Sequence, residues 1–205
     1  HVGELLTAVE QAGLKKDTLV VFMSDNGGHP EYVANAPLRG SKWNLYEGGI
    51  RVPLLVRWPG CVQPNATRST PVIGYDLFPT LAAAAGRPVP AGAAIDGVNL
   101  LPLLNHPRRR SDPEYDRSLY WHFPYYHPEG TKFGAAKKEI GVSDFAVSQT
   151  RPHSAIRRGD HKLIYFDEDG RSELYHLKKD RSEQNNLGAS PTGQELEKDL
   201  LNHLD

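Results

Sequence analysis

Three side chains in the segment 24–53 have types and spacing that could support chemistry. Asp25 offers a carboxylate and Asn26 an amide carbonyl, directly after a short apolar run. Adjacent oxygen donors of this kind suit a hard cation such as Ca²⁺ or Mg²⁺. Because Ca²⁺ takes about six to eight oxygens, these two side chains would need further ligands from outside the chain. The sequence DNGG also favours a turn, so a plain turn is the alternative interpretation.

Lys42 is the third candidate, and it lies in the glycine-rich loop RGSK at 39–42. Nearby glycines let the backbone approach a ligand closely, and a flexible ammonium can meet an anionic oxygen group as a point charge. A simply solvated loop lysine is the alternative. Glu47 and Arg51 follow in the same loop, and we expect them to form an internal ion pair that holds it.

The elements that position these residues alternate between helix and strand. The hydrophobic patterns predict, in order, a helix over 2–12, a strand over 18–24, a strand over 52–58 and a helix over 76–85. The first strand is a continuous apolar run, which is typical of a strand buried on both faces. Open α/β sheets bind ligands at the carboxyl ends of their strands, where Asp25 and Asn26 stand. We therefore predict an α/β fold with a mostly parallel sheet sandwiched by helices.

The sequence changes character near residue 112. Beyond it, short aromatic and alternating runs joined by turns predict a small antiparallel sheet, and an amphipathic pattern predicts a final helix over 193–204. We therefore predict two domains, the C-terminal part of an α/β domain over 1–112 and a small α+β subdomain over 113–205. The stretch 124–150 has few pattern signals, and a long loop of this kind is often functional.

His122 and His127 stand in the aromatic stretch YWHFPYYH. Such histidines could bind substrate or donate a proton. For His122 two interpretations stay open, a substrate-binding residue and a sheet-edge histidine packed among aromatic rings, whereas for His127 we expect the second. The chain has 9 histidines but no pair with a recognisable zinc-ligand motif, so no zinc site is expected.

The composition narrows the possible partners. Lys and Arg number 24 against 25 Asp and Glu, so the net charge of -1 gives no general attraction to nucleic acid or to an anionic membrane. No apolar run approaches the roughly 20 residues that cross a bilayer. Cys61 is the single cysteine, which excludes an internal disulfide. The chain begins inside a helical pattern without an initiating Met, and we expect it to be a fragment that lacks its N-terminal half.

Several motifs, in order, resemble the sulfatase family. They are SDNGG at 24–28, PLRGSK at 37–42, YEGGIRVP at 46–53, WPG at 58–60, YDLFPTL at 75–81, DGVNLLPLL at 96–104 and ELYHL at 173–177. The last of these has His176 where an Asp is commoner in the family. The resemblance covers most of the chain and implies the C-terminal portion of a formylglycine-dependent, arylsulfatase-like enzyme of the alkaline phosphatase-like superfamily. Residues 1–112 would then belong to its catalytic domain.

The resemblance implies a role for each candidate residue. Asp25 and Asn26 would be ligands of a divalent cation, with Ca²⁺ expected and Mg²⁺ as the alternative. Lys42 would contact the sulfate group as a catalytic and substrate-binding residue. Some similar sulfatases bring a C-terminal histidine to the substrate, so His122 is kept as a substrate-binding candidate. The nucleophile would be a formylglycine in the missing N-terminal half, because Cys61 lacks the C-x-P-x-R context of the family.

Three functions follow as hypotheses. The first is a sulfatase fragment, whose parent hydrolyses sulfate esters of a small molecule or glycan and whose partner is the missing N-terminal half. The second is a phosphate or phosphonate ester hydrolase of the same superfamily, where Asp-His often replaces the Asp-Asn pair, so Asn26 favours the first. The third is a non-catalytic binding or structural fragment, which describes the isolated chain best. The resemblance implies a periplasmic, secreted or lysosomal location, and neither nucleic acid nor a membrane is expected as a partner.

Overall fold

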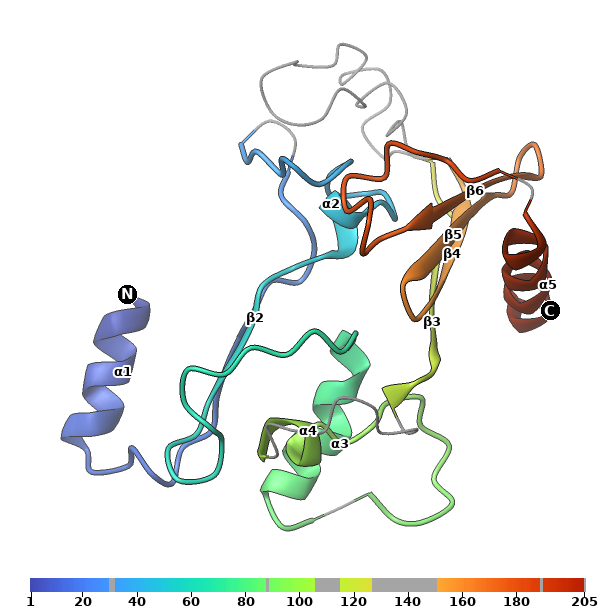
Figure 1. Ribbon diagram of the computed structural model, residues 1–205. Helices are drawn as coiled ribbons and strands as arrows, with labels where there is room; N and C mark the ends of the chain where they lie inside the picture. The colour runs from blue at the N-terminus through green and yellow to red at the C-terminus, as the bar shows by residue number, and fades with distance from the viewer. Residues whose placement is uncertain (30–31, 88, 106–114, 127–150, 189, 205) are drawn as a thin grey trace. The chain divides into compact units, whose positions relative to one another are not determined.

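The computed structural model describes residues 1–29, 32–87, 89–105, 115–126, 151–188 and 190–204 (Figure 1). The chain forms two compact units, the first from His1–Met23 and Leu54–Arg117, the second from Ser24–Pro53 and Ser118–Asp205. The candidates Asp25, Asn26, Lys42 and His122 all belong to the second unit. The division into two domains at residue 112 stays a prediction. Among the described residues, no helix has the length and apolar character needed to cross a membrane.

The first unit combines helices with a two-stranded sheet. Its elements are α1 (Val2–Gln11), β1 (Val20–Met23), β2 (Leu54–Arg57), a 3₁₀ turn (Gly74–Asp76), α3 (Leu77–Ala84) and α4 (Leu101–Asn105). β1 and β2 pair antiparallel, with Val20 opposite Arg57 and Met23 opposite Leu54. The expectation of a mostly parallel sheet is therefore not met by this pair. An apolar run does not encode the direction of its neighbour, and mixed sheets commonly carry an antiparallel strand.

Asp76 organises the helical part of the first unit. We expected this residue to begin the helix, and it does precede α3 directly. Its buried carboxylate, however, makes no capping hydrogen bond to α3. It accepts hydrogen bonds from the backbone N–H groups of Ile73 and Val98, each at 3.0 Å. It also pairs with the Arg117 guanidinium. These contacts fix the start of α3 against the loop that leads to α4.

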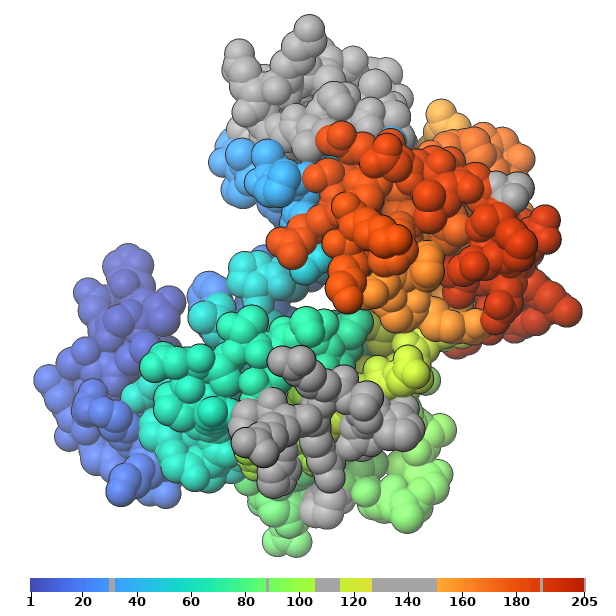
Figure 2. Space-filling model, viewed as in Figure 1, coloured from blue at the N-terminus to red at the C-terminus, as the bar shows by residue number. Residues whose placement is uncertain are grey.

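The second unit is built on a four-stranded antiparallel meander. Its elements are α2 (Glu47–Ile50), β3 (Ser118–Phe123), β4 (His153–Arg158), β5 (His161–Phe166), β6 (Arg171–His176) and α5 (Pro191–Leu204). The strand order is β3-β4-β5-β6, so each strand pairs with the next one along the chain. The predicted mixed α/β class, antiparallel sheet and C-terminal helix are thereby confirmed. In Figure 2 the residues of β4 to α5, in orange to red, form one continuous surface.

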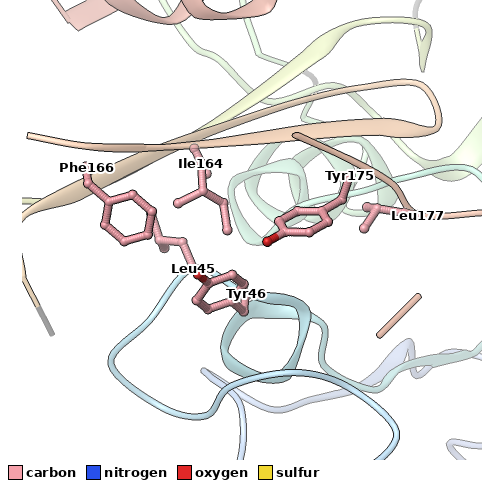
Figure 3. Packing of buried hydrophobic residues seen from close by; sticks show 7 residues of the cluster. Leu45, Tyr46, Ile164, Phe166, Tyr175 and Leu177 are labelled. Atoms are coloured by element: carbon pink, nitrogen blue, oxygen red, sulfur yellow. The ribbon is translucent and has the colours of Figure 1, made fainter. Parts of the chain in front are cut away.

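The pleat divides the sheet's side chains between two faces. On one face, α5 buries Leu196 and Leu200 against the sheet residues Ile156, Leu163 and Leu174. The other face is covered by the segment 24–53. Figure 3 shows Leu45 and Tyr46 of that segment packed with the sheet residues Ile164, Phe166 and Tyr175 and with Leu177. The segment that holds the candidate residues thus sits on the face opposite α5.

Candidate functional site

Backbone hydrogen bonds tie the two ends of the segment 24–53 together. The N–H of Gly27 donates to the carbonyl of Gly49 at 2.7 Å, and the N–H of Lys42 donates to the carbonyl of Gly28 at 3.1 Å. The Asn35 side chain bridges the same turn, accepting from the Gly28 N–H at 3.0 Å and donating to the Gly28 carbonyl at 3.1 Å. These bonds hold Lys42 and the Asp-Asn turn in one piece of local structure.

Two glycines of this segment are required by close backbone approach. A Cβ on Gly27 would lie 1.7 Å from the carbonyl oxygen of Gly48, and one on Gly49 would lie 1.9 Å from that of Asn44. No side chain fits at such distances, so only glycine allows these backbones to touch. Gly27, part of the DNGG sequence, therefore packs against α2, and Gly49 within α2 packs against the backbone of Asn44.

Asp25 and Asn26 present oxygen atoms from adjacent positions. The Asn26 N–H donates to Oδ1 of Asp25 at 3.0 Å, and Nδ2 of Asn26 donates to the Gly27 carbonyl at 2.9 Å. With the amide nitrogen engaged there, Oδ1 of Asn26 and Oδ2 of Asp25 remain as donor atoms for a cation. This donor chemistry fits Ca²⁺ or Mg²⁺. Within the described ranges no three His, Cys, Asp or Glu residues gather to hold a metal.

The Lys42 side chain is half-buried and directed by a neighbouring ring. Its Nζ lies 5.4 Å from the centre of the Trp43 ring. An ammonium at this distance is attracted to the negative face of an indole. The backbone N–H of Lys42 donates to the Gly28 carbonyl, so the main chain at this position is fixed as well.

A buried group of three ions fastens the segment to the sheet, and we call Glu47, Lys162 and Glu183 the buried triad. Nζ of Lys162, on β5, lies 3.1 Å from Oε1 of Glu47 and 2.8 Å from Oε1 of Glu183. The other carboxylate oxygen of Glu183 accepts from the Glu47 backbone N–H at 2.6 Å. Arg51 donates to Oε2 of Glu47 at 2.9 Å, which confirms the predicted ion pair.

The two carboxyl groups of the buried triad respond differently to their surroundings. Burial raises the pKa of Glu47, but Lys162 and the other nearby cations outweigh it and hold that pKa below its ordinary value. Burial also raises the pKa of Glu183, and there Lys162 offsets only part of the effect, so the pKa stays above its ordinary value.

A second polar group lies beside the buried triad. Nη1 of Arg39 donates to the Tyr175 hydroxyl at 2.8 Å and to the Glu183 carbonyl at 3.0 Å. The hydroxyls of Tyr46 and Tyr175 both donate to Oε2 of Glu173, at 2.6 and 2.7 Å. Burial and the Glu173 carboxylate raise the pKa of both tyrosines, so the two hydroxyls keep their protons and remain donors.

His153, on β4, makes a third connection to the segment. Its Nε2 accepts from the Leu45 N–H at 3.0 Å, and its Nδ1 lies 2.6 Å from the Arg151 carbonyl, to which it donates. Both ring nitrogens are thus used by the neutral imidazole. Burial lowers the pKa of His153. Sequence reasoning missed this residue, because nothing local marks a strand histidine that accepts a backbone N–H.

Sequence reasoning also missed the role of Lys162. The signal was a lysine inside the apolar strand HKLIYF, at a position where the pleat turns it inward. A fully buried lysine requires a partner. The sequence nevertheless contains many carboxylates and does not say that Glu47 and Glu183 are the two that meet it.

The structure does not bring His122 together with the other candidates. His122 is exposed on β3, and its Nδ1 lies 2.8 Å from the Ser154 hydroxyl. It alternates with Trp121, which packs toward the cluster of Leu45, so His122 projects from the face that α5 covers. This geometry fits the sheet-edge interpretation. His127 lies outside the described residues.

This chain is similar in sequence and in structure to known proteins. The family model described as Sulfatase matches residues 1–87. A sulfatase from Formosa agariphila is 35% identical over 96% of this chain and 35% of its own length. Ps i-CgsB in complex with k-i-k-neocarrahexaose has a TM-score of 0.74 at 29% identity, covering 99% of this chain and 39% of that one. BT4656 in complex with its substrate, D-glucosamine-2-N,6-O-disulfate, has a TM-score of 0.72 at 28% identity, covering 99% and 36%. The chain thus spans about two fifths or less of the length of these proteins.

Replacing the buried ammonium tests the triad. Lys162→Met should lower the free energy of unfolding by about 3–5 kcal/mol, because two buried carboxyl groups lose their cation. Lys179→Met, at an exposed position, should change it by less than about 0.5 kcal/mol. Urea unfolding of both variants measures the free energies of unfolding. Equal losses in the two variants would contradict a stabilising role of Lys162 in the buried triad.

His153 predicts a pH dependence of stability. Its pKa is lowered in the folded state, so below the ordinary value of about 6.5 the unfolded chain binds a proton that the folded chain resists. Stability should therefore fall as the pH drops from about 7.5 to 5.5. His153→Gln should reduce the slope by up to about 1.4 kcal/mol per pH unit. Urea unfolding at several pH values checks this, and equal slopes for the two proteins would rule out His153 as the cause.

Proposed function

We propose that this chain, which is part of a sulfatase-family protein, forms one wall of the site at which that protein hydrolyses sulfate esters. The observation that carries the proposal is the bond from the Lys42 N–H to the Gly28 carbonyl, which joins a candidate anion-binding lysine to the Asp-Asn turn. A sulfate group carries negative oxygens, and fixed positive charge stabilises them as more charge develops during ester cleavage.

Lys42 is proposed to contact the sulfate oxygens as both a binding and a catalytic residue. Its partial burial strengthens its attraction to an anion relative to a fully solvated lysine. Its position is held by the Gly28 bond and by the Trp43 ring. For His122, exposed on the other face of the sheet, we propose a structural role at the sheet edge.

Asp25 and Asn26 are proposed as two ligands of a divalent cation. The sulfatase family is generally metal-dependent, and we propose Ca²⁺, with Mg²⁺ as the alternative. A cation bound there would withdraw charge from the sulfate oxygens. The role of this chain is to hold the two oxygen donors rigidly, through the Gly27–Gly49 bond and the close packing of both glycines. The remaining ligands and the nucleophile, a formylglycine, are proposed to come from residues outside this chain.

A sulfated glycan is the substrate class that we propose. Both solved relatives are complexes with carbohydrates, and one of these is described as a substrate that carries two sulfates. By family resemblance we also propose a periplasmic, secreted or lysosomal location for the whole protein. The alternative of a phosphate or phosphonate ester hydrolase is not favoured. The isolated chain is expected to be inactive, because it supplies only part of the site.

Lys42 provides the direct test of the function. In the full-length protein that contains this chain, Lys42→Ala should lower kcat/KM for a sulfate ester by roughly 10²–10³-fold, a typical loss for one oxyanion-stabilising donor. Lys179→Ala, at an exposed position, should leave it unchanged. Steady-state kinetics of both variants, with a sulfate ester and with an aryl phosphate as substrates, measure these effects. Unchanged kinetics would remove Lys42 from the site, and hydrolysis of the phosphate alone would overturn the proposed class.

Asp25 provides the test of the metal. Asp25→Asn in the full-length protein should raise the Ca²⁺ concentration for half-maximal activity by about tenfold or more, because one charged ligand becomes neutral. Asp167→Asn, also exposed, serves as the control. Calorimetric titration of the isolated chain should show weak Ca²⁺ binding or none. Tight binding there would mean that this chain supplies a complete ligand set.

A further inference from the structure

An aromatic cluster of His29, Tyr32 and Trp43 lies beside Lys42. The His29 and Tyr32 rings stack with centroids 4.8 Å apart, and the Trp43 ring meets His29 edge-on at 4.7 Å. The Lys42 ammonium lies 5.4 Å from the Trp43 ring centre. The cluster therefore leads from the proposed sulfate-binding group to Tyr32, which is 78% exposed.

The aromatic cluster lies outside the buried hydrophobic core of the described residues. A single exposed aromatic residue is ordinary, whereas rings in mutual contact at the surface form a patch that commonly has a function. The N–H groups of Tyr32 and Val33 both donate to the His29 carbonyl, at 3.1 and 3.0 Å, so backbone hydrogen bonds hold the stacked pair.

Trp43 is held in an unfavourable backbone conformation. Its φ is 78°, in the left-handed region that residues with large side chains rarely adopt. Such strain persists only where the surroundings impose it, and it gathers at functional sites. Here Oδ1 of Asn44 accepts from the N–H groups of Ser41 and Tyr46, at 3.4 and 3.3 Å, and closes the turn. The result is an indole ring placed between the Lys42 ammonium and His29.

We propose that His29, Tyr32 and Trp43 form the subsite that receives the sugar ring of a sulfated glycan whose ester group meets Lys42. The proposal rests on the proposed function and deepens it. Aromatic faces carry partial negative charge, and the C–H groups on one face of a pyranose are weakly positive, so the two surfaces attract. Ligand sites combine such apolar walls with a few placed polar groups. Lys42 supplies the charge here, and the cluster supplies the apolar contact.

Tyr32 is the residue to change, because it is the most exposed ring of the cluster. In the full-length protein, Tyr32→Ala should raise KM about tenfold for the best substrate among a panel of monosulfated monosaccharides, with little change in kcat. KM for propyl sulfate, an ester without a ring, and inhibition by inorganic sulfate should not change. Tyr32→Phe keeps the ring and should keep the original KM.

Binding of the same sugars, followed by quenching of tryptophan fluorescence, separates failure of the subsite from failure of the activity. An equal KM for the original protein and Tyr32→Ala would overturn the subsite and leave the proposed function intact. A lower melting temperature of Tyr32→Ala with an unchanged KM would also overturn the subsite, and it would assign Tyr32 a role in packing. Binding that needs Tyr32, without hydrolysis of any sulfate ester, would overturn the proposed function and leave the subsite standing.

Discussion

The buried ammonium of Lys162 determines where the segment 24–53 lies. Glu47 reaches it from α2 and Glu183 from the chain beyond β6, and all three side chains are almost completely excluded from water. Removing ions from water costs several kcal/mol each, and close pairing with additional hydrogen bonds is needed to offset that cost. The Glu183 carboxylate gains such a bond from the Glu47 N–H. Any displacement of α2 from the sheet would leave buried charge without a partner.

The position of α2 directly affects the position of the candidate site. Glu47 opens this short helix, and Gly49, two residues later, accepts the hydrogen bond from Gly27. Gly27 follows Asn26, so the contact between β5 and α2 continues into the Asp-Asn turn. Because Gly27 and Gly49 pack at backbone distance, the connection has little freedom to bend. The metal ligands that we propose are therefore placed by a lysine far away in the sequence.

The two faces of the four-stranded sheet serve different purposes. The α5 face is sealed by leucines and an isoleucine, as an ordinary core requires. On the opposite face, the apolar centre is surrounded by the buried triad, by His153 and by the hydrogen-bonded group of Arg39, Tyr175 and Glu173. Apolar contacts tolerate small shifts, whereas charged and hydrogen-bonded contacts demand one geometry. This division suits a sheet that is anchored by a helix on one side and must position a loop on the other.

The sequence by itself determined the family resemblance, the candidates Asp25, Asn26 and Lys42, and the ion pair of Glu47 with Arg51. These features depend on residues close together in the chain, as do the alternating strands of the meander and the amphipathic final helix. Only the tertiary structure decided which carboxylates meet Lys162, which face His122 occupies, and that Trp43 lies against His29. It also decided the antiparallel pairing of β1 with β2. Local patterns report the conformation of a segment and the side it buries. The partner of that side depends on charge and shape across distant segments, which no local pattern encodes.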